Sequence, residues 1–246
     1  MASPETTGTP FDLTPEQEEI RRVCRDFAAR EIRPIAAAVD EADVETPWEV
    51  FHKAAGLGLT SFMIPQELGG GGMTDALTGC VVQEELCHGC SGIGNLITSG
   101  GFFAEPVLAL GTDEQKERWV RPLTGDTPPM TALATTEPEA GSDAASIATL
   151  ARRVDGGYVL DGQKTWISNG GLAELYVVFA TVERGSGHRG ITAFLLHRDD
   201  EGLSFGRPMR KMGQRAIVNT ELFLAGCYVP DDRRLGAEGD GFPGLM

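Results

Sequence analysis

Hydroxyl and glycine residues gather in one stretch of the chain in a pattern that suits a phosphate-bearing ligand. Gly141 and Ser142 follow a break at Pro138, and such a turn can donate backbone amides and a hydroxyl to a phosphate. Thr135 and Thr136 end an apolar, extended run that starts at residue 131. If that run is a strand, its end offers hydroxyls and free backbone groups to the edge of a heterocycle.

A second stretch places an aromatic side chain beside a hydroxyl. Trp166 offers a broad face for stacking, and Ser168 points the same way two residues further along an extended chain. Each part alone also has a purely structural explanation. Serine and threonine beside glycine usually form turns, and a strand tryptophan usually belongs to the core. The residues by themselves leave a ligand site and an ordinary strand pair equally open.

Charge and composition limit the classes of partner. The chain has 246 residues, a net charge of −15, and ordinary hydrophobic (41%) and charged (23%) fractions. So acidic a protein is not expected to bind nucleic acid or an anionic membrane as its main partner.

No apolar run approaches the length of about 18 residues that a membrane span needs. The first dozen residues do not resemble a secretory signal, so the five cysteines are expected to be reduced and the protein cytoplasmic.

Helix start signals recur three times in the first half. Thr14, Thr46 and Thr112 are each followed three residues later by Gln or Glu, which is the pattern of a capping box. The segment 74–86 is apolar enough to form a buried helix. The apolar run 93–103 contains several small residues, so it either packs closely on another helix or lines a ligand channel. The first half is therefore predicted to be helical.

The second half is predicted to form strands. Runs rich in β-branched and aromatic residues alternate with glycine-containing turns at a spacing of roughly ten residues. This pattern favours an antiparallel barrel or sandwich over a βαβ fold. The predicted fold class is α+β, with an all-α helical domain over residues 1–129 and an antiparallel β-barrel or sandwich domain over residues 130–246.

Neither a metal centre nor an acid–base residue is predicted from the remaining motifs. Cys87 and Cys90 have the spacing of half a zinc site, but a structural site needs four ligands and no second pair follows. We therefore expect small, buried thiols and no metal. Glu84 and Glu85 are carboxylates on a predicted helix, where solvated side chains greatly outnumber catalytic ones.

Residues 135–143 (Thr-Thr-Glu-Pro-Glu-Ala-Gly-Ser-Asp) and 162–170 (Gly-Gln-Lys-Thr-Trp-Ile-Ser-Asn-Gly) closely resemble the two flavin-contacting segments of the acyl-CoA dehydrogenase family. Flanking segments agree in the same order along nearly the whole chain. Residues 13–17, 65–70 and 111–116 resemble the family's N-terminal helical domain, and residues 211–215 and 229–230 resemble the end of its β-domain.

The resemblance implies non-covalently bound FAD. The backbone from Leu133 through Ala134 and Thr135 would follow the flavin edge, and Thr136 would bond the pyrimidine side of the ring. Many members have an aromatic residue in place of Leu133. In the second segment Trp166 and Ile167 would lie near the ring, and Ser168 would reach flavin N5. In the turn between the segments, Gly141 and Ser142 would lie by the pyrophosphate, with Ser142 also a candidate for the pantetheine arm of the substrate.

The activity that the resemblance implies is the α,β-dehydrogenation of an acyl-CoA thioester. A carboxylate removes the α-proton, the β-hydrogen passes to the flavin as hydride, and an electron-transfer flavoprotein reoxidises the flavin. The family continues into a C-terminal helical domain that normally supplies the catalytic glutamate. No catalytic base is therefore assigned up to Met246, Glu137 included, and the 246-residue chain is expected to be inactive alone.

Two further expectations concern assembly. The full-length protein is expected to be a homo- or hetero-oligomer, a dimer or a tetramer. An alternative is a non-catalytic subunit that binds FAD or acyl-CoA and pairs with a complementary dehydrogenase chain.

Overall fold

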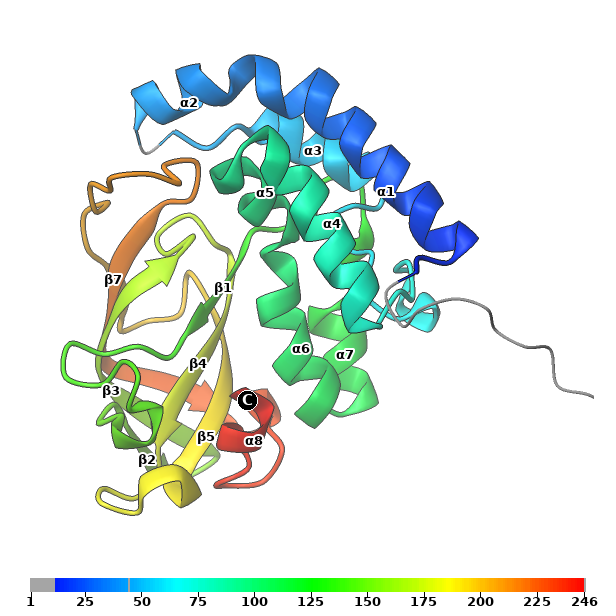
Figure 1. The fold of residues 1–246 in the computed structure, drawn as a ribbon. Helices are drawn as coiled ribbons and strands as arrows, with labels where there is room; N and C mark the ends of the chain where they lie inside the picture. Colours follow the sequence, from blue (N-terminus) through cyan, green and yellow to red (C-terminus); the bar gives the residue numbers. More distant parts are fainter. Residues whose placement is uncertain (1–11, 44, 246) are drawn as a thin grey trace, which may run out of the picture.

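The protein's structure is a computed structural model, and it describes residues 12–43 and 45–245. Helices come first along the chain and strands follow (Figure 1). This order confirms the predicted helical part followed by a β-part. The helices of the first half are α1 (Pro15–Phe27), α2 (Ala36–Ala42), α3 (Trp48–Gly56), α4 (Ala76–Gly89), α5 (Ser91–Thr98), α6 (Gly100–Leu110) and α7 (Asp113–Trp119).

Capping boxes open α1 and α7, as predicted. The Thr14 hydroxyl accepts a hydrogen bond from the Gln17 amide (3.2 Å), and the Gln17 side chain accepts one from the Thr14 amide (3.0 Å). Thr112 and Gln115 repeat this reciprocal pair. Each box satisfies two backbone donors that the helix itself leaves unpaired.

The predicted cap at Thr46 is wrong. Pro47 occupies the N-cap position of α3, and the hydroxyl of Thr46 is buried without a hydrogen-bond partner. The Trp48 amide donates to the Thr46 carbonyl at 2.9 Å. This tight turn starts the helix one residue later than the capping pattern predicts.

The apolar segment from Ser91 to Leu110 is longer than expected. Together α5 and α6 form a run of 20 residues with a mean hydropathy of 1.2, enough to cross a membrane by length and composition alone. Packing accounts for part of this apolarity: Ile93, Leu96 and Ile97 are fully buried, but only 44% of the most apolar 18-residue stretch is buried within the protein. Core helices of soluble proteins satisfy the same criterion.

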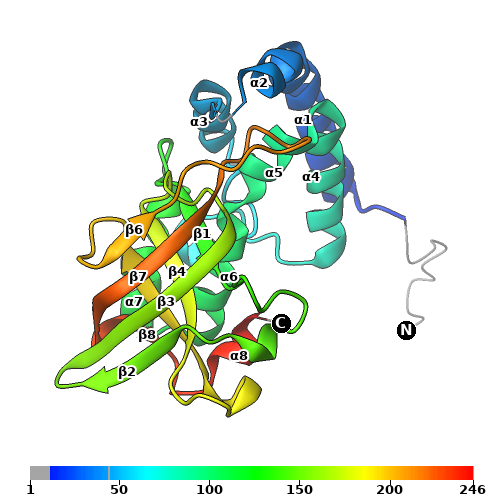
Figure 2. The same cartoon turned by 90° about the vertical axis from the view of Figure 1, so that its left-hand side faces the viewer.

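The described strands form one eight-stranded sheet in the order β6-β7-β3-β2-β4-β5-β8, with β1 paired to β4. Figure 2 shows the long strands β3 and β7 running side by side. Most pairs are antiparallel, but β1 runs parallel to β4, and β2 meets β4 in parallel at one residue pair. The strands are β1 (Thr131–Ala134), β2 (Leu150–Val154), β3 (Gly157–Ser168), β4 (Leu175–Thr181), β5 (Ile191–His197), β6 (Leu203–Phe205), β7 (Asn219–Pro230) and β8 (Arg234–Leu235).

Strand β4 is buried on both faces. Tyr176 and Val178 belong to one core cluster of the sheet, whereas Val177 and Phe179 belong to a second cluster shared with α6 and α7. Alternate side chains of a strand point to opposite faces, so this single strand joins the two cores. A short last helix, α8 (Gly241–Leu245), lies near α6 and β5 (Figure 1).

Candidate functional site

The structure brings the two predicted site segments side by side. The Thr165 amide in β3 donates to the carbonyl of Thr136, and the Lys164 ammonium donates to the carbonyl of Thr135, both at 2.9 Å. The segment that leaves β1 is therefore hydrogen-bonded to the last residues of β3. Sequence reasoning proposed these segments as parts of one site, and their backbones are in direct contact.

A buried ion pair fixes this contact. Lys164 Nζ lies 2.7 Å from Glu137 Oε1, and neither side chain is more than 6% exposed. The same carboxylate accepts hydrogen bonds from the backbone amides of Ala148 (2.7 Å) and Thr149 (3.0 Å). Glu137 therefore links the first segment to β3 and to the approach to β2.

The two partners titrate in a way that keeps the pair charged near neutral pH. Burial opposes ionisation of Glu137, but the charge of Lys164 and three hydrogen bonds hold the pKa of the carboxyl below its ordinary value. Burial lowers the pKa of Lys164 to about 8, and the attraction of Glu137 acts against that shift. A carboxylate with a lowered pKa and a buried cationic partner is poorly suited to take a proton from a substrate.

The predicted turn follows directly after this ion pair. Glu137 and Ala140 exchange two backbone hydrogen bonds, of 2.9 and 3.2 Å, so residues 137–140 form a tight reversal. Gly141 and Ser142 come next, and both are exposed. A Cβ atom added to Gly141 would meet nothing within 4 Å. The glycine–serine turn is therefore open to a ligand.

Trp166 and Ser168 are exposed on either side of the buried residue Ile167, as the predicted alternation requires. Trp166 is 60% exposed, which rules out the core position usual for a strand tryptophan. The strand is not regular there, contrary to the expected extended chain. Trp166 has a φ of +59°, and the register between β3 and β7 shifts between Lys164 and Ile167. The shift is a local bulge, which re-aims side chains.

The backbone of β1 has a free edge. This strand pairs with β4 on one side, and none of the described strands forms a ladder on the other. Leu133 and Thr135 are half-buried, and the Thr135 hydroxyl is buried without a hydrogen-bond partner. An orphaned buried hydroxyl costs stability unless a further group binds it. Ala134 is fully buried, so only its backbone is available at this edge.

Sequence reasoning missed two asparagines that hold these residues. Asn219 opens β7 and donates to the Trp166 carbonyl at 2.9 Å. Asn169 has a φ of +59° and donates to the hydroxyl of Ser99 and the carbonyl of Thr131, both at 3.1 Å. No local pattern marks Asn219, and the 162–170 motif contains Asn169 without indicating its role, because both residues act through partners distant in the sequence.

A cleft of about 630 Å³ lies along helices α4, α5 and α6. Asn95, Thr98 and Phe102 contribute to its lining, and Phe102 is 65% exposed. The run 93–103 therefore contributes both to the core and to the wall of a cleft, and its role as a ligand channel stays a prediction. Some of its residues are packed in the core, and others line a space large enough for a small ligand.

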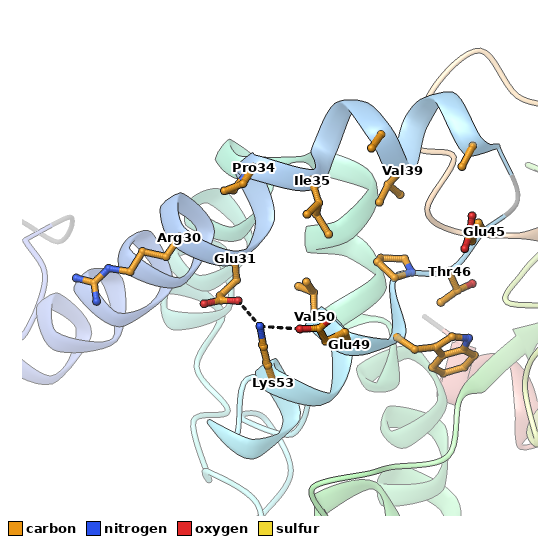
Figure 3. A pocket seen from close by; sticks show the side chains of 14 residues that line it. Arg30, Glu31, Pro34, Ile35, Val39, Glu45, Thr46, Glu49, Val50 and Lys53 are labelled. Carbon is orange, nitrogen blue, oxygen red and sulfur yellow. Dashed lines mark hydrogen bonds and ion pairs between the residues drawn. The ribbon is translucent and has the colours of Figure 1, made fainter.

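A second hollow, of about 490 Å³, lies between α2 and α3 (Figure 3). The Lys53 ammonium lies at its rim, 2.8 Å from a Glu31 oxygen and 3.0 Å from a Glu49 oxygen. The unpartnered hydroxyl of Thr46 also belongs to the lining. None of the predicted site residues contributes to this hollow.

The remaining candidates have structural partners. Glu85 is bound by the guanidinium of Arg25 at 2.6 and 2.9 Å, so this carboxylate is engaged in an ion pair. Cys87 and Cys90 are free thiols but only half-buried, so the prediction that both are buried is wrong. Across residues 12–43 and 45–245, no group of three or more His, Cys, Asp or Glu side chains is arranged to hold a metal ion.

The fold itself defines the class of protein. Butyryl-CoA dehydrogenase from Megasphaera elsdenii superposes on 96% of this chain with a TM-score of 0.89 and 32% identity, over 62% of its own length. An acyl-CoA dehydrogenase from Bacillus anthracis, solved in complex with FAD, superposes on 96% of the chain with a TM-score of 0.85 and 29% identity, over 41% of its own length.

Sequence comparisons agree with the fold. Residues 14–126 match the acyl-CoA dehydrogenase N-terminal domain, and residues 132–227 match the acyl-CoA dehydrogenase middle domain. Cyclohex-1-ene-1-carbonyl-CoA dehydrogenase of Geobacter metallireducens is 39% identical over 95% of the chain. The human mitochondrial short-chain specific acyl-CoA dehydrogenase is 37% identical over 94% of the chain.

The chain therefore belongs to the acyl-CoA dehydrogenase family. It spans 61% of the Geobacter relative and 56% of the human one.

Proposed function

We propose that this protein takes part in the FAD-dependent α,β-dehydrogenation of an acyl-CoA thioester. The observation that carries the proposal is the direct contact between the 135–136 segment and the 164–168 segment in a member of this family. Residues 1–129 would form the helical domain, and residues 130–246 the β-domain that contacts the flavin; residues 1–11, 44 and 246 of these ranges lie outside the described residues. The change from helices to strands between α7 and β1 supports that division.

The free edge of β1 fits the rim of a flavin ring. The backbone of residues 133–136 would follow the ring edge, with Thr136 on the pyrimidine side. The orphaned hydroxyl of Thr135 supports this assignment, because it is a buried polar group that still lacks a partner. Leu133 would pack beside the ring, and Ala134, whose side chain is buried, would contribute only its backbone.

The end of β3 would hold the other side of the ring. Trp166 would cover the ring with its exposed indole, and Ser168 would direct its hydroxyl to the reactive nitrogen N5. Ile167 would contribute its backbone, since its side chain points into the core. The open turn of Gly141 and Ser142 would bind the pyrophosphate, or in the case of Ser142 the pantetheine arm of the substrate.

Bound FAD would supply the hydride acceptor of the reaction. The chain's own residues would orient the ring, keep water from its covered face and present a hydrogen-bond donor at Ser168. The cleft along α4, α5 and α6 is where we propose that the acyl chain lies. Its lining includes both Phe102 and the amides of Gln83 and Asn95.

The base that takes the α-proton is not assigned to Glu137. Its ion pair with Lys164 and its lowered pKa make it a structural carboxylate. We propose that the base comes from a part of the full-length enzyme other than residues 1–246. On this proposal the 246-residue chain binds the cofactor and does not turn over by itself.

The proposed partners follow from the family. An electron-transfer flavoprotein would accept the electrons, and the full-length protein would be an oligomer. Five free cysteines, two of them buried, support a reducing compartment, for which we propose the cytoplasm. The human relative is mitochondrial by name.

The experiment that tests the function measures flavin bleaching on addition of acyl-CoA esters under anaerobic conditions. The full-length protein is expected to bleach with at least one ester of a panel that varies chain length and branching. The isolated 246-residue chain is expected to bind FAD without bleaching. Bleaching at full-length rates by the short chain would overturn the assignment of the base, and absence of FAD binding by both would overturn the function. FAD binding without bleaching by both would favour the non-catalytic subunit.

A further inference from the structure

Asn219 contacts both exposed residues at the end of β3, Trp166 and Ser168. It is the first residue of β7 and lies opposite Ser168 in the β3–β7 register. Its Nδ2 donates to the carbonyl of Trp166 at 2.9 Å and to the hydroxyl of Ser168 at 3.3 Å. One side-chain amide therefore contacts both residues that would face the flavin.

Lys211 fixes the orientation of this amide. The ammonium of Lys211 donates to Asn219 Oδ1 at 2.7 Å, and an ammonium has donors only. The oxygen of the Asn219 amide must therefore face Lys211, which turns its NH₂ group toward Trp166 and Ser168. Lys211 also donates to the carbonyls of Gln214 (2.9 Å) and Ile217, so all three of its protons have acceptors.

The bulge at Trp166 explains why such an anchor is needed. Trp166 has a φ of +59°, which a side chain of this size rarely adopts, and its indole is 60% exposed. Packing of the indole therefore does little to hold the bulge in place. The hydrogen bond from Asn219 to the Trp166 carbonyl restrains the backbone of the bulge instead. Residues held in such conformations persist when the surroundings over-determine them.

The bond to Ser168 also sets the direction of its proton. A serine hydroxyl carries one donor and two acceptor positions. Because Ser168 accepts from Asn219, its own O–H stays free to donate to a ligand on the exposed side. A hydroxyl that was turned the other way would present only lone pairs to the proposed nitrogen of the flavin.

We propose that Asn219 is a positioning residue that sets the Trp166 indole and the Ser168 hydroxyl, and that Lys211 orients Asn219 for this role. The consequence for the flavin rests on the proposed function; the effect on Trp166 does not. The loop that carries Lys211 is tied to the helices, since Asn95 donates to the Gln214 side chain at 3.2 Å. The positions of Trp166 and Ser168 therefore depend on the contact between this loop and α5.

The test uses the 246-residue chain and follows the indole N–H resonance of Trp166 in ¹H–¹⁵N spectra. Three tryptophans give three such signals, and Trp166→Phe identifies the one from Trp166. Asn219→Leu removes both hydrogen bonds from the amide. Asn219→Asp keeps an oxygen for Lys211 but cannot donate. Gln163→Ala is the matched control, because it removes another amide bond between β3 and β7, the 2.8 Å bond to Glu221.

Both Asn219 variants are expected to shift or broaden the Trp166 signal, and the control is expected to leave it in place. In a parallel titration, the two variants should bind FAD about tenfold more weakly than the parent chain, the effect of losing one or two hydrogen bonds at the site. Lys211→Met should reproduce the shift of the Trp166 signal, and Lys211→Arg should restore part of the parent position.

The outcomes separate the two proposals. An unchanged Trp166 signal in a folded Asn219→Leu chain overturns the positioning role, whatever the flavin does. A shifted signal in Asn219→Leu but a normal one in Asn219→Asp overturns the role of the donated bonds. If the Asn219 variants shift the Trp166 signal as expected but the parent chain binds no FAD, the positioning role is supported and the proposed function is contradicted.

Discussion

The side chain of Asn169 donates to the hydroxyl of Ser99 at 3.1 Å, across 70 positions of sequence. This bond joins the end of β3 to the break between α5 and α6. The same amide donates to the Thr131 carbonyl at the start of β1. One side chain that is 1% exposed therefore connects the helical part, β1 and β3 at the base of the proposed site.

Replacing this residue is expected to weaken the whole fold. Asn169→Ala removes two buried hydrogen bonds and places alanine at a φ of +59°, for a combined cost of about 2–4 kcal/mol. Asn169→Gly loses the same bonds but tolerates the backbone, so it should cost about 1 kcal/mol less. Urea unfolding measures both free energies. Equal stability of Asn169→Ala and the parent chain would show that the two hydrogen bonds of Asn169 do not stabilise the fold.

The buried pair of Lys164 and Glu137 predicts a large cost for removing one partner. Lys164→Met leaves the carboxylate buried without its counter-charge, and such a change costs about 3–5 kcal/mol. The double variant Lys164→Met, Glu137→Gln should be more stable than the single one, because no unpaired charge remains.

An exposed ion pair provides the control for this experiment. Arg22 and Glu19 lie 2.5 Å apart with side chains that are 70% and 58% exposed. Arg22→Met should leave the free energy of unfolding almost unchanged, because solvent screens an exposed ion pair. A Lys164→Met cost as small as that of Arg22→Met would contradict the structural role of the buried pair.

The same pair predicts a dependence of stability on acid. The pKa of Glu137 in the folded protein lies below the ordinary value of 4.5, so the unfolded chain takes up a proton more readily. The stability from Glu137 is therefore complete above pH 4.5 and is lost as the pH falls through the folded pKa.

Thermal unfolding between about pH 7 and about pH 3 measures this effect. The melting temperature of the parent chain should fall more steeply below pH 4.5 than that of the double variant Lys164→Met, Glu137→Gln. Other carboxylates titrate alike in both proteins and cancel in the comparison. Parallel curves would mean that Glu137 contributes nothing to acid sensitivity.

Much of the fold could be predicted because its signals are local. The capping boxes at Thr14 and Thr112 depend on residues only three positions apart, and both are present. The prediction at Thr46 failed although the same local pattern is there. The N-cap of α3 is Pro47 because of a tight turn between Thr46 and Trp48, and the capping pattern does not encode that turn.

The residues of the candidate site could be predicted because their signals are also local. The residues that hold them in place could not. Thr136, Ser142, Trp166 and Ser168 stand out by residue type and spacing. Asn219 and Lys211 lie about 50 and 40 residues away from Ser168 along the chain. They reach it only because β7 pairs with β3, and sequence alone does not give that register.

The final prediction separates binding from stability at the proposed flavin site. The Trp166 side chain is 60% exposed, so Trp166→Ala should change the free energy of unfolding by about 0.5 kcal/mol or less. Loss of stacking against the flavin should weaken FAD binding about five- to tenfold. Trp48→Ala is the control: this residue is 40% exposed on α3 and lines the hollow between α2 and α3, and its loss should leave FAD affinity unchanged.

Ser168→Ala tests the hydroxyl on the same background. Its removal should lower FAD affinity about threefold or less, since one exposed hydrogen bond is lost. The larger change is expected in the rate of flavin reduction in the full-length protein, because the donor at the reactive nitrogen is gone. Equilibrium titration and stopped-flow absorbance measure the two quantities. If Trp166→Ala and Ser168→Ala both keep normal flavin content and normal reduction rates, the flavin lies elsewhere on the protein.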